Sequence, residues 1–276
     1  MSHVPIVRVD GDTVYSPIHH YHHPGTGRVI DLVLTVHFGE SDYYAQLRKA
    51  IDSRTAAGAV VYSESYKPKH TKPTLTRGER KLITAMVAEA KTTQARLTLI
   101  GWQIQPEGLP AQPDWVDCDL PTIEVIRRIG VRKLRLATGI ARLIKGRRIT
   151  TAGAKKVKQE IAIAVRLNAK APRKRKSATE KIMLDERDAA ALQAVRNEDR
   201  DTVLLWGLSH GRNLHTGLAD LGYTHTSTDW YRVAADPIIA RYNRPRRQSA
   251  PDGNPATATA AETKPASRRP IREHRP

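Results

Sequence analysis

The sequence contains one cysteine, one phenylalanine and few aromatic residues of any kind, 5% in total. A single cysteine, Cys118, excludes an internal disulfide framework and fits a reducing cytoplasm. No apolar run approaches the roughly 20 residues that a membrane-spanning helix needs. The first residues also lack the basic and apolar regions of a secretory signal peptide. These absences predict a cytoplasmic protein without a membrane span.

The net charge of +18 is concentrated in two parts of the 276-residue chain. Residues 127–176 hold 18 Lys or Arg side chains and one acidic side chain, and residues 241–276 hold 9 basic and 3 acidic ones. The rest of the chain is slightly acidic. The basic block 127–176 therefore predicts a non-specific attraction to nucleic acid. The scarcity of aromatic side chains gives base stacking little support.

Apolar runs that are typical of buried strands alternate with helical periods, which predicts an α/β domain over residues 28–237. The expected sheet is mixed and contains parallel β-α-β units. A strand that begins at Arg28 leads to His37. A helix with Ser41 at its N-cap follows, and a second strand leads to Glu64.

The middle of the domain is predicted to be helical. Apolar positions recur at helical spacing over residues 121–176, which indicates a basic insertion of two or three helices, broken near Gly146 and Gly153. Ahead of it, Thr76 and Glu79 have the spacing of a capping box and indicate the start of another helix.

The two ends of the chain are predicted to lie outside this domain. Residues 1–27 are expected to form an irregular arm, with four histidines within His19–His23. Such a tract can bind metal ions, although a histidine-rich loop is more often a solvated segment. Residues 238–276 are rich in Pro, Ala, Thr and Arg, a composition that predicts a disordered tail.

Three potential metal ligands each follow a predicted strand: His37, Glu64 and His210. Since the carboxyl ends of parallel strands share one edge of a sheet, we expect these side chains to converge. Two imidazoles and a carboxylate can hold a catalytic divalent ion such as Zn, Mn or Co and leave a position open for water. Arg187 could then stabilise an oxyanion or bind a substrate carboxylate. A single histidine after a strand is more often structural.

Longer motifs around these residues resemble a known family. RVIDLVLTVHFGESDYYAQLRKAIDS with GAVVYSES, and DTVLLWGLSHGRNLHTGLADLGY, are similar to the two G-x-x-H blocks of the TraB/PrgY/GumN family. DWVDCDLP and MLDERDAAAL resemble its Trp-Asp stretch and its arginine segment, and the likeness covers most of residues 28–233. Relatives of the family include the TIKI metalloproteases and the erythromycin-esterase/ChaN group.

The resemblance implies a metal-dependent, peptidase-like hydrolase that acts on a peptide or a small molecule. Carried over residue by residue, it makes His37, Glu64 and His210 the metal ligands. It assigns catalytic roles to Glu64, Arg187 and His210.

The sequence departs from the family pattern at three places. Leu34 stands where the family has glycine, and Asp188 stands where asparagine is usual. Residues 211–213, Gly-Arg-Asn, follow His210 in place of Leu-Pro-Gly. A catalytically inactive or nucleic-acid-associated basic binding protein, using residues 127–176 and the tail, is therefore an alternative hypothesis.

A second alternative is a serine hydrolase that uses Ser209. The segment Gly207–Gly211 reads GLSHG, which satisfies the G-x-S-x-G nucleophile elbow between a strand and a helix. Few strands follow this segment, and no HGGG-like oxyanion loop precedes it. The acids and histidines available downstream for a triad are Asp220, Asp229, His215 and His225.

Overall fold

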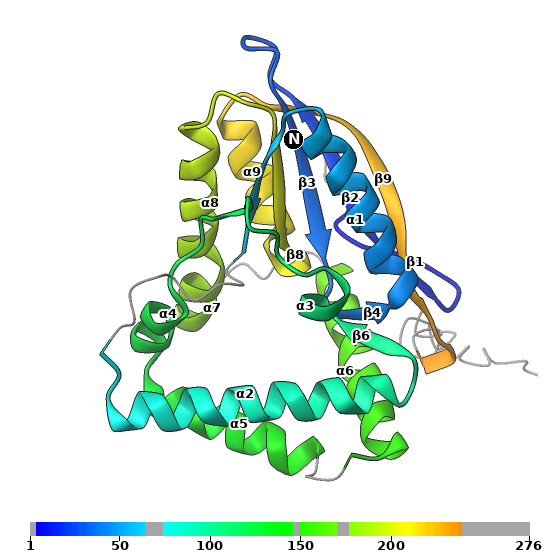
Figure 1. Ribbon diagram of the computed structural model, residues 1–276, viewed down its shortest axis with the longest axis vertical. Helices are drawn as coiled ribbons and strands as arrows, with labels where there is room; N and C mark the ends of the chain where they lie inside the picture. Colours follow the sequence, from blue (N-terminus) through cyan, green and yellow to red (C-terminus); the bar gives the residue numbers. More distant parts are fainter. Residues whose placement is uncertain (1–3, 65–73, 146–148, 170–176, 239–276) are drawn as a thin grey trace, which may run out of the picture. The chain divides into compact units, whose positions relative to one another are not determined.

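The computed structural model describes residues 4–64, 74–145, 149–169 and 177–238. They build a seven-stranded mixed sheet in the order β1-β2-β3-β8-β5-β7, with β9 paired to β2 (Figure 1). The predicted α/β class is confirmed. The strands of this sheet are β1 (Arg8–Asp10), β2 (Thr13–His22), β3 (Val29–Thr35), β5 (Val60–Ser63), β7 (Val116–Asp117), β8 (Thr202–Gly207) and β9 (Thr224–Ala235).

Four neighbouring strands, β3, β8, β5 and β7, run parallel to one another. Every residue of β8 is buried, and β3 is buried from Ile30 to Thr35. Continuous apolar burial of this kind is expected when helices cover both faces of a sheet. The strands β3 and β5 of the predicted β-α-β unit run parallel in this sheet, with β8 between them and paired with both. All these strands end at the same edge of the sheet.

The N-terminal segment belongs to the sheet, so the prediction of an irregular arm over residues 1–27 is wrong. β2 pairs antiparallel with β3 on one side and with β9 on the other, and its start also pairs with β1. Polar side chains occupy buried positions of β2: Ser16 and His19 both have 0% of their surface exposed. Hydropathy alone therefore does not reveal this strand.

The histidine tract His19–His23 does not present its imidazoles together. Successive side chains of a strand point to opposite faces of the sheet. His19 Nδ1 lies 2.9 Å from Thr228 Oγ1, whereas His20 Nδ1 lies 2.7 Å from Asp31 Oδ1. The tract is thus divided between the two faces.

Helices cover both faces of the sheet. On one face, Ile51 of α1 (Ser41–Ala56) lines a small cavity together with Val33 of β3. The next residue of β3, Leu34, points the other way and lies against Gly211 at the start of α9 (Gly211–Asp220). The alternation of β3 therefore fixes which helix each side chain contacts.

The start of α1 differs by one residue from the prediction. Its N-cap is Glu40, with an extended backbone at φ −68° and ψ 153°, instead of Ser41. Glu40 makes no capping hydrogen bond. Its carboxylate accepts from the Ala235 N–H at 3.0 Å and from Arg232 Nη2 at 2.5 Å, both on β9. The N-cap residue of α1 is thus bonded to β9, a strand far away in the sequence, and not to the helix itself.

The predicted basic insertion is helical and consists of α4 (Thr122–Ile129), α5 (Val131–Lys145) and α6 (Thr151–Ala169). Its first break falls at Gly130, where φ is +98°, a conformation that favours glycine. The break predicted near Gly153 lies just before the start of α6, because residues 149 and 150 are not helical and the helix begins at Thr151. Gly146 lies outside the described residues, and so does the predicted disordered tail from residue 239 onwards.

α2 (Arg77–Thr98) packs against α5 and α6 and begins at the predicted capping box. Thr76 Oγ1 accepts from the Glu79 N–H at 3.2 Å, and the Glu79 carboxylate accepts from the Thr76 N–H at 2.7 Å. Within the described ranges, no helix is long and apolar enough to cross a membrane. The remaining elements are β4 (Phe38–Glu40), β6 (Trp102–Ile104), α3 (Gln105–Gly108), α7 (Ala178–Glu180), the π-helical turn η1 (Lys181–Asp185), α8 (Glu186–Arg196) and the 3₁₀ turn η2 (Leu208–His210).

A polar network around His20 joins β2, β3 and β9. His20 Nδ1 lies 2.7 Å from Asp31 Oδ1, and its Nε2 lies 3.2 Å from Asp229 Oδ2. Arg54 Nε of α1 forms an ion pair with the other oxygen of Asp31 at 2.5 Å. The hydrogen bond to Asp31 raises the pKa of His20 above its ordinary value of 6.5, although burial acts in the opposite direction.

We expect His20 to stabilise the fold mainly on the acid side of its titration. Because the pKa of His20 is higher in the folded state, its contribution to the free energy of unfolding is fully present below pH 6.5. This contribution is lost as the pH rises through the pKa of the folded state. In urea unfolding between about pH 5 and about pH 9, the destabilisation caused by His20→Gln should shrink with rising pH. His22→Gln, at an exposed position of the same strand, is the matched control. A His20→Gln difference that stays constant across this range would contradict the assignment.

Candidate functional site

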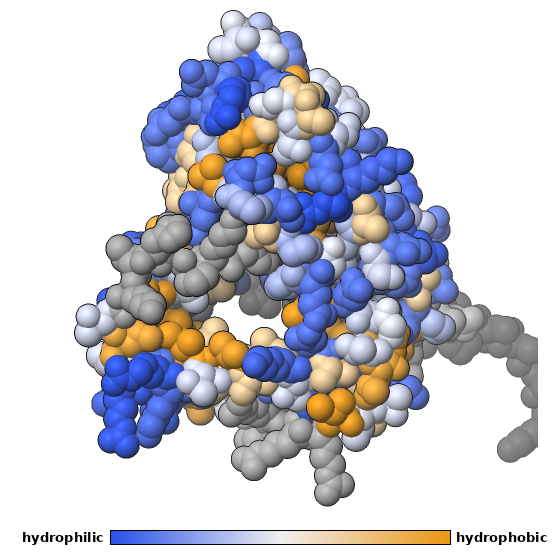
Figure 2. All heavy atoms as spheres, viewed as in Figure 1, coloured by the Kyte–Doolittle hydropathy of each residue, from blue (hydrophilic) through white to orange (hydrophobic). Residues whose placement is uncertain are grey.

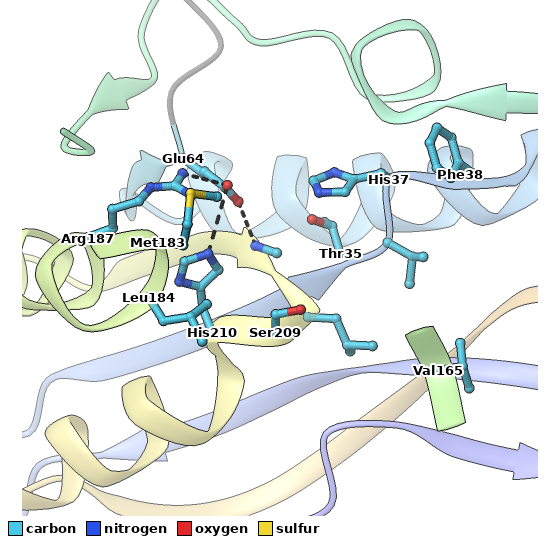
Figure 3. A pocket seen from close by; sticks show the side chains of 13 residues that line it. Thr35, His37, Phe38, Glu64, Val165, Met183, Leu184, Arg187, Ser209 and His210 are labelled. Atoms are coloured by element: carbon cyan, nitrogen blue, oxygen red, sulfur yellow. Dashed lines mark hydrogen bonds and ion pairs between the residues drawn. The ribbon is translucent and has the colours of Figure 1, made fainter. Parts of the chain in front are cut away.

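A cavity of about 460 Å³ lies where β3, β5 and β8 end. It is lined by His37 after β3, Glu64 after β5 and His210 after β8, together with Arg187 of α8 (Figure 3). The convergence predicted from the parallel strands is therefore observed. Ser209 also lines this cavity.

The carboxylate of Glu64 is held from two sides. Its Oε2 accepts from the Gly207 N–H at 2.9 Å, and its Oε1 accepts from Arg187 Nη2 at 2.6 Å. A Cβ at Gly207 would lie 3.0 Å from Oε2, so glycine permits this close approach. Burial raises the pKa of Glu64, but Arg187, His210 and His37 together outweigh it and bring the pKa below its ordinary value. Glu64 is thus ionised at neutral pH.

Arg187 is shared between two carboxylates. Its Nε donates to Asp119 Oδ1 at 2.8 Å, and its Nη2 donates to Asp119 Oδ2 at 2.5 Å as well as to Glu64. Burial lowers the pKa of Arg187, but the two carboxylates outweigh this and raise it above its ordinary value. Asp119 is 3% exposed and was not among the predicted site residues. It follows β7, a strand that runs parallel to β5, so its place at this edge could have indicated it.

His210 is oriented by a second carboxylate that the sequence did not assign. Its Nδ1 lies 2.5 Å from Asp188 Oδ1, and Asn213 Nδ2 donates to Asp188 Oδ2 at 2.7 Å. An ionised carboxylate only accepts hydrogen bonds, so the Nδ1–H of His210 donates to Asp188. The other ring nitrogen, Nε2, lies 4.0 Å from Glu64 Oε1 and is an acceptor whenever the ring is neutral.

His37 lies at the exposed side of the cavity. Its Nδ1 is 3.3 Å from Gln105 Oε1, and its carbonyl oxygen accepts from the Gln105 N–H at 2.9 Å. The short helix α3 thus fixes both the backbone and the ring of His37. In Figure 3 the imidazole lies beside Thr35, on the opposite side of Glu64 from Arg187.

The rest of the cavity wall is apolar. The π-helical turn η1 directly precedes α8, which carries Arg187, and contributes two side chains to the wall. Single π-helical turns often occur at functional sites. A further side chain comes from α6, one of the helices of the basic insertion. The apolar lining residues are Val36, Phe38, Val165, Met183, Leu184 and Leu208.

The predicted metal ligands share the cavity but do not form an ion-sized cluster. Among the described residues, no group of three or more His, Cys, Asp or Glu side chains could hold a metal ion as arranged. Both oxygens of Glu64 are already engaged, one of them by the positive charge of Arg187. Metal dependence therefore stays a prediction.

The arrangement around Ser209 differs from a serine triad. Ser209 is exposed and lies in the turn η2. The downstream histidines contact other groups, since His215 Nδ1 lies 2.9 Å from Tyr21 Oη and His225 Nε2 lies 2.9 Å from Thr228 Oγ1. The serine-hydrolase alternative has no supporting triad contact in the described part of the chain.

Comparison of the chain with protein-family models, with curated proteins and with solved structures gives no significant match. Membership of the TraB/PrgY/GumN family therefore stays a prediction. The nucleic-acid partner predicted for residues 127–176 is likewise untested.

Two departures from the family pattern compensate for each other in space. The side chain of Leu34 fills the volume in front of Gly211, and a Cβ added there would lie 2.4 Å from Leu34 Cδ1 and 2.9 Å from Ile6 Cγ2. Leu34 is fully buried. The buried side chain of Leu34 on β3 thus leaves room only for a glycine after His210. The third departure, Asp188, likewise contacts Asn213 from the altered segment.

We predict that Gly211→Ala and Leu34→Ala are strongly coupled. Gly211→Ala should destabilise the fold by about 1–3 kcal/mol through overpacking. Leu34→Ala should cost about 2–5 kcal/mol through the cavity that it leaves. The double variant should lose less than the sum, by at least about 0.5 kcal/mol. Urea unfolding measures all three.

Gly139→Ala is the matched control for this cycle. Gly139 lies within α5, and no atom comes within 4 Å of a Cβ built there. The alanine should therefore stabilise the helix by up to about 1 kcal/mol. Additive effects of Gly211→Ala and Leu34→Ala would show that the two side chains do not compete for space.

Proposed function

We propose that this protein is a hydrolase of carbonyl compounds, with the cavity at the ends of β3, β5 and β8 as its active site. The observation that carries the proposal is the buried Asp188–His210 pair, whose Nε2 faces the ionised Glu64 across 4.0 Å. An imidazole oriented by a carboxylate is a common general base of hydrolytic sites. Burial strengthens every electrostatic interaction within such a site.

In the proposed reaction, a water molecule donates one hydrogen bond to His210 Nε2 and one to Glu64. Its oxygen attacks the substrate carbonyl carbon while Nε2 takes a proton, so that a C–O bond forms and an anionic tetrahedral intermediate results. The bond to the leaving group then breaks, and the imidazolium returns the proton to that group. Asp188 stabilises the imidazolium, and the positive charge of Arg187 stabilises the developing oxyanion.

The walls of the cavity favour a substrate that carries an apolar group beside its carbonyl. Apolar side chains such as Phe38, Met183 and Leu184 line the cavity together with its charged groups. A peptide with an apolar side chain fits both kinds of lining. Peptidase-like hydrolysis, implied by the family resemblance, is the specific form that we propose.

The hydrolase proposal is tested by kinetics on two probes, quenched-fluorescent casein and p-nitrophenyl butyrate. His210→Ala should lower kcat by about 10²–10⁴-fold, the usual contribution of a general base. Asp188→Asn should lower kcat strongly with little change in KM, because Asp188 acts on the imidazole and not on the substrate. His22→Ala, at an exposed position of β2, is the control that should leave both constants unchanged.

Ser209→Ala distinguishes direct attack by water from a serine nucleophile. Retained activity supports water attack, whereas loss of activity together with labelling of the wild type by a fluorophosphonate would assign the reaction to Ser209. Wild-type rates in His210→Ala on both probes would reject the proposed general base.

Metal-dependent hydrolysis at the same cavity is the second candidate function. It is favoured by the Asp188–His210 contact, because a metal-bound histidine usually donates its second ring N–H to a carboxylate or carbonyl. Metal analysis of the purified wild type, Glu64→Ala and His210→Ala tests it. Equal metal content in all three would exclude an ion at this cavity. Loss of activity with a chelator, reversed by Zn or Mn, would establish the metal-dependent form.

A further inference from the structure

Helix α5 carries large apolar side chains on its outward side. Leu136 is 67% exposed, and Ile140, one turn later, is 48% exposed. Helical geometry places the exposed residues Arg132, Lys133 and Arg135 on both sides of this pair. Neither side chain belongs to the hydrophobic core of the described residues. α5 thus presents an apolar stripe between positive charges.

A groove between α2 and α5 adjoins this stripe. Its volume is about 200 Å³, and it has a cation from each helix, Lys81 and Arg135. Arg135 directly precedes Leu136, and Gly139 of the groove directly precedes Ile140. The groove and the stripe are therefore adjacent parts of one surface. The other lining residues are Leu82, Ala85 and Thr138.

Further exposed apolar side chains lie on the same helical layer. Met86 and Val87 belong to α2, Ile163 belongs to α6, and Ile149 precedes α6. Figure 2 shows apolar side chains gathered over α2 among hydrophilic ones. Exposed apolar side chains edged by charge are typical of an interaction surface.

The charge of the sequence segment that contains α5 and α6 decides the class of the partner. Residues 127–176 hold 18 basic residues against one acidic residue, a net charge of +17. A second copy of the chain would present the same positive surface, and the segment 241–276 of the chain itself is also basic. Like charges repel in both cases, so the complementary partner is anionic.

We propose that this surface docks onto an anionic lipid bilayer, with a headgroup phosphate in the Lys81–Arg135 groove and with Leu136 and Ile140 at the acyl boundary. A nucleic-acid duplex would use the cations alone and would leave the apolar stripe in water. Residues 122–178 also contain no aromatic side chain for base stacking. A bilayer removes the stripe from water and attracts each nearby cation. Docking of this kind is independent of any reaction in the cavity.

Co-sedimentation of the full-length protein with lipid vesicles tests the proposal. The protein should bind vesicles with about one-third phosphatidylserine in phosphatidylcholine, and not phosphatidylcholine alone. The double variant Leu136→Ser/Ile140→Ser should bind the anionic vesicles about tenfold or more weakly. Arg135→Gln should weaken binding about fivefold. Val116→Ser, at a 42% exposed apolar position of β7, is the matched control and should not change binding.

The same proteins are titrated against a fluorescent DNA duplex at the same salt concentration. Each variant is first checked for a wild-type thermal unfolding midpoint, and Leu136→Asn replaces the double variant if the latter melts early. No binding to anionic vesicles at low salt would overturn the proposal. So would vesicle binding that the apolar variants leave unchanged, since charge alone would then explain it. Tighter binding to the duplex than to vesicles would assign the surface to nucleic acid.

Discussion

The site depends on one guanidinium that two buried carboxylates share. Asp119 follows β7 and Glu64 follows β5, so the parallel sheet brings two negative charges to the same edge. Without a positive charge between them, two buried carboxylates would repel each other and resist ionisation. Arg187 lies between them, and loss of one member of such a buried group typically costs about 3–5 kcal/mol because a charge is left uncompensated. The same contact keeps Glu64 ionised and turned toward His210. The positive charge that compensates these two carboxylates in the fold therefore also determines the charge state of the cavity.

The convergence of His37, Glu64 and His210 could be predicted because it depends only on strand direction. Long apolar runs identify β3 and β8 in the sequence. Because the strands pair in parallel with a regular register, the residues that follow each strand lie at the same edge of the sheet. Arg187 was suggested by its chemistry and by the resemblance, because it does not follow a strand. Asp119 escaped notice because β7 has only two residues, too few for any periodicity. Asp188 was recognised only as an unusual residue, since its contact with His210 spans 22 positions of the sequence and depends on how α8 meets η2.

The N-terminal strand shows a different limit of sequence reasoning. β2 carries a buried histidine, His19, where hydropathy expects an aliphatic residue, and the interior accepts it as a neutral ring. Burial, followed by the neighbouring His225 and His215, lowers the pKa of His19 to about 3. Its ring remains uncharged at neutral pH and its Nδ1 lies within hydrogen-bonding distance of Thr228 Oγ1. A strand of this kind is recognisable only once its partners β3 and β9 are known, because its pairing with them, and not its side-chain hydropathy, identifies it as a strand.

Two side chains of α6 that are only two positions apart belong to different surfaces of the protein. Val165 is buried in the cavity wall, whereas Ile163 is 43% exposed on the other side of the same helix. A regular helix is stiff over this length, so a rotation that moves one side chain moves the other. Any molecule that binds α6 from outside and favours one rotational setting changes the shape of the cavity. By reciprocity, a ligand that fills the cavity changes the affinity for that molecule by the same factor.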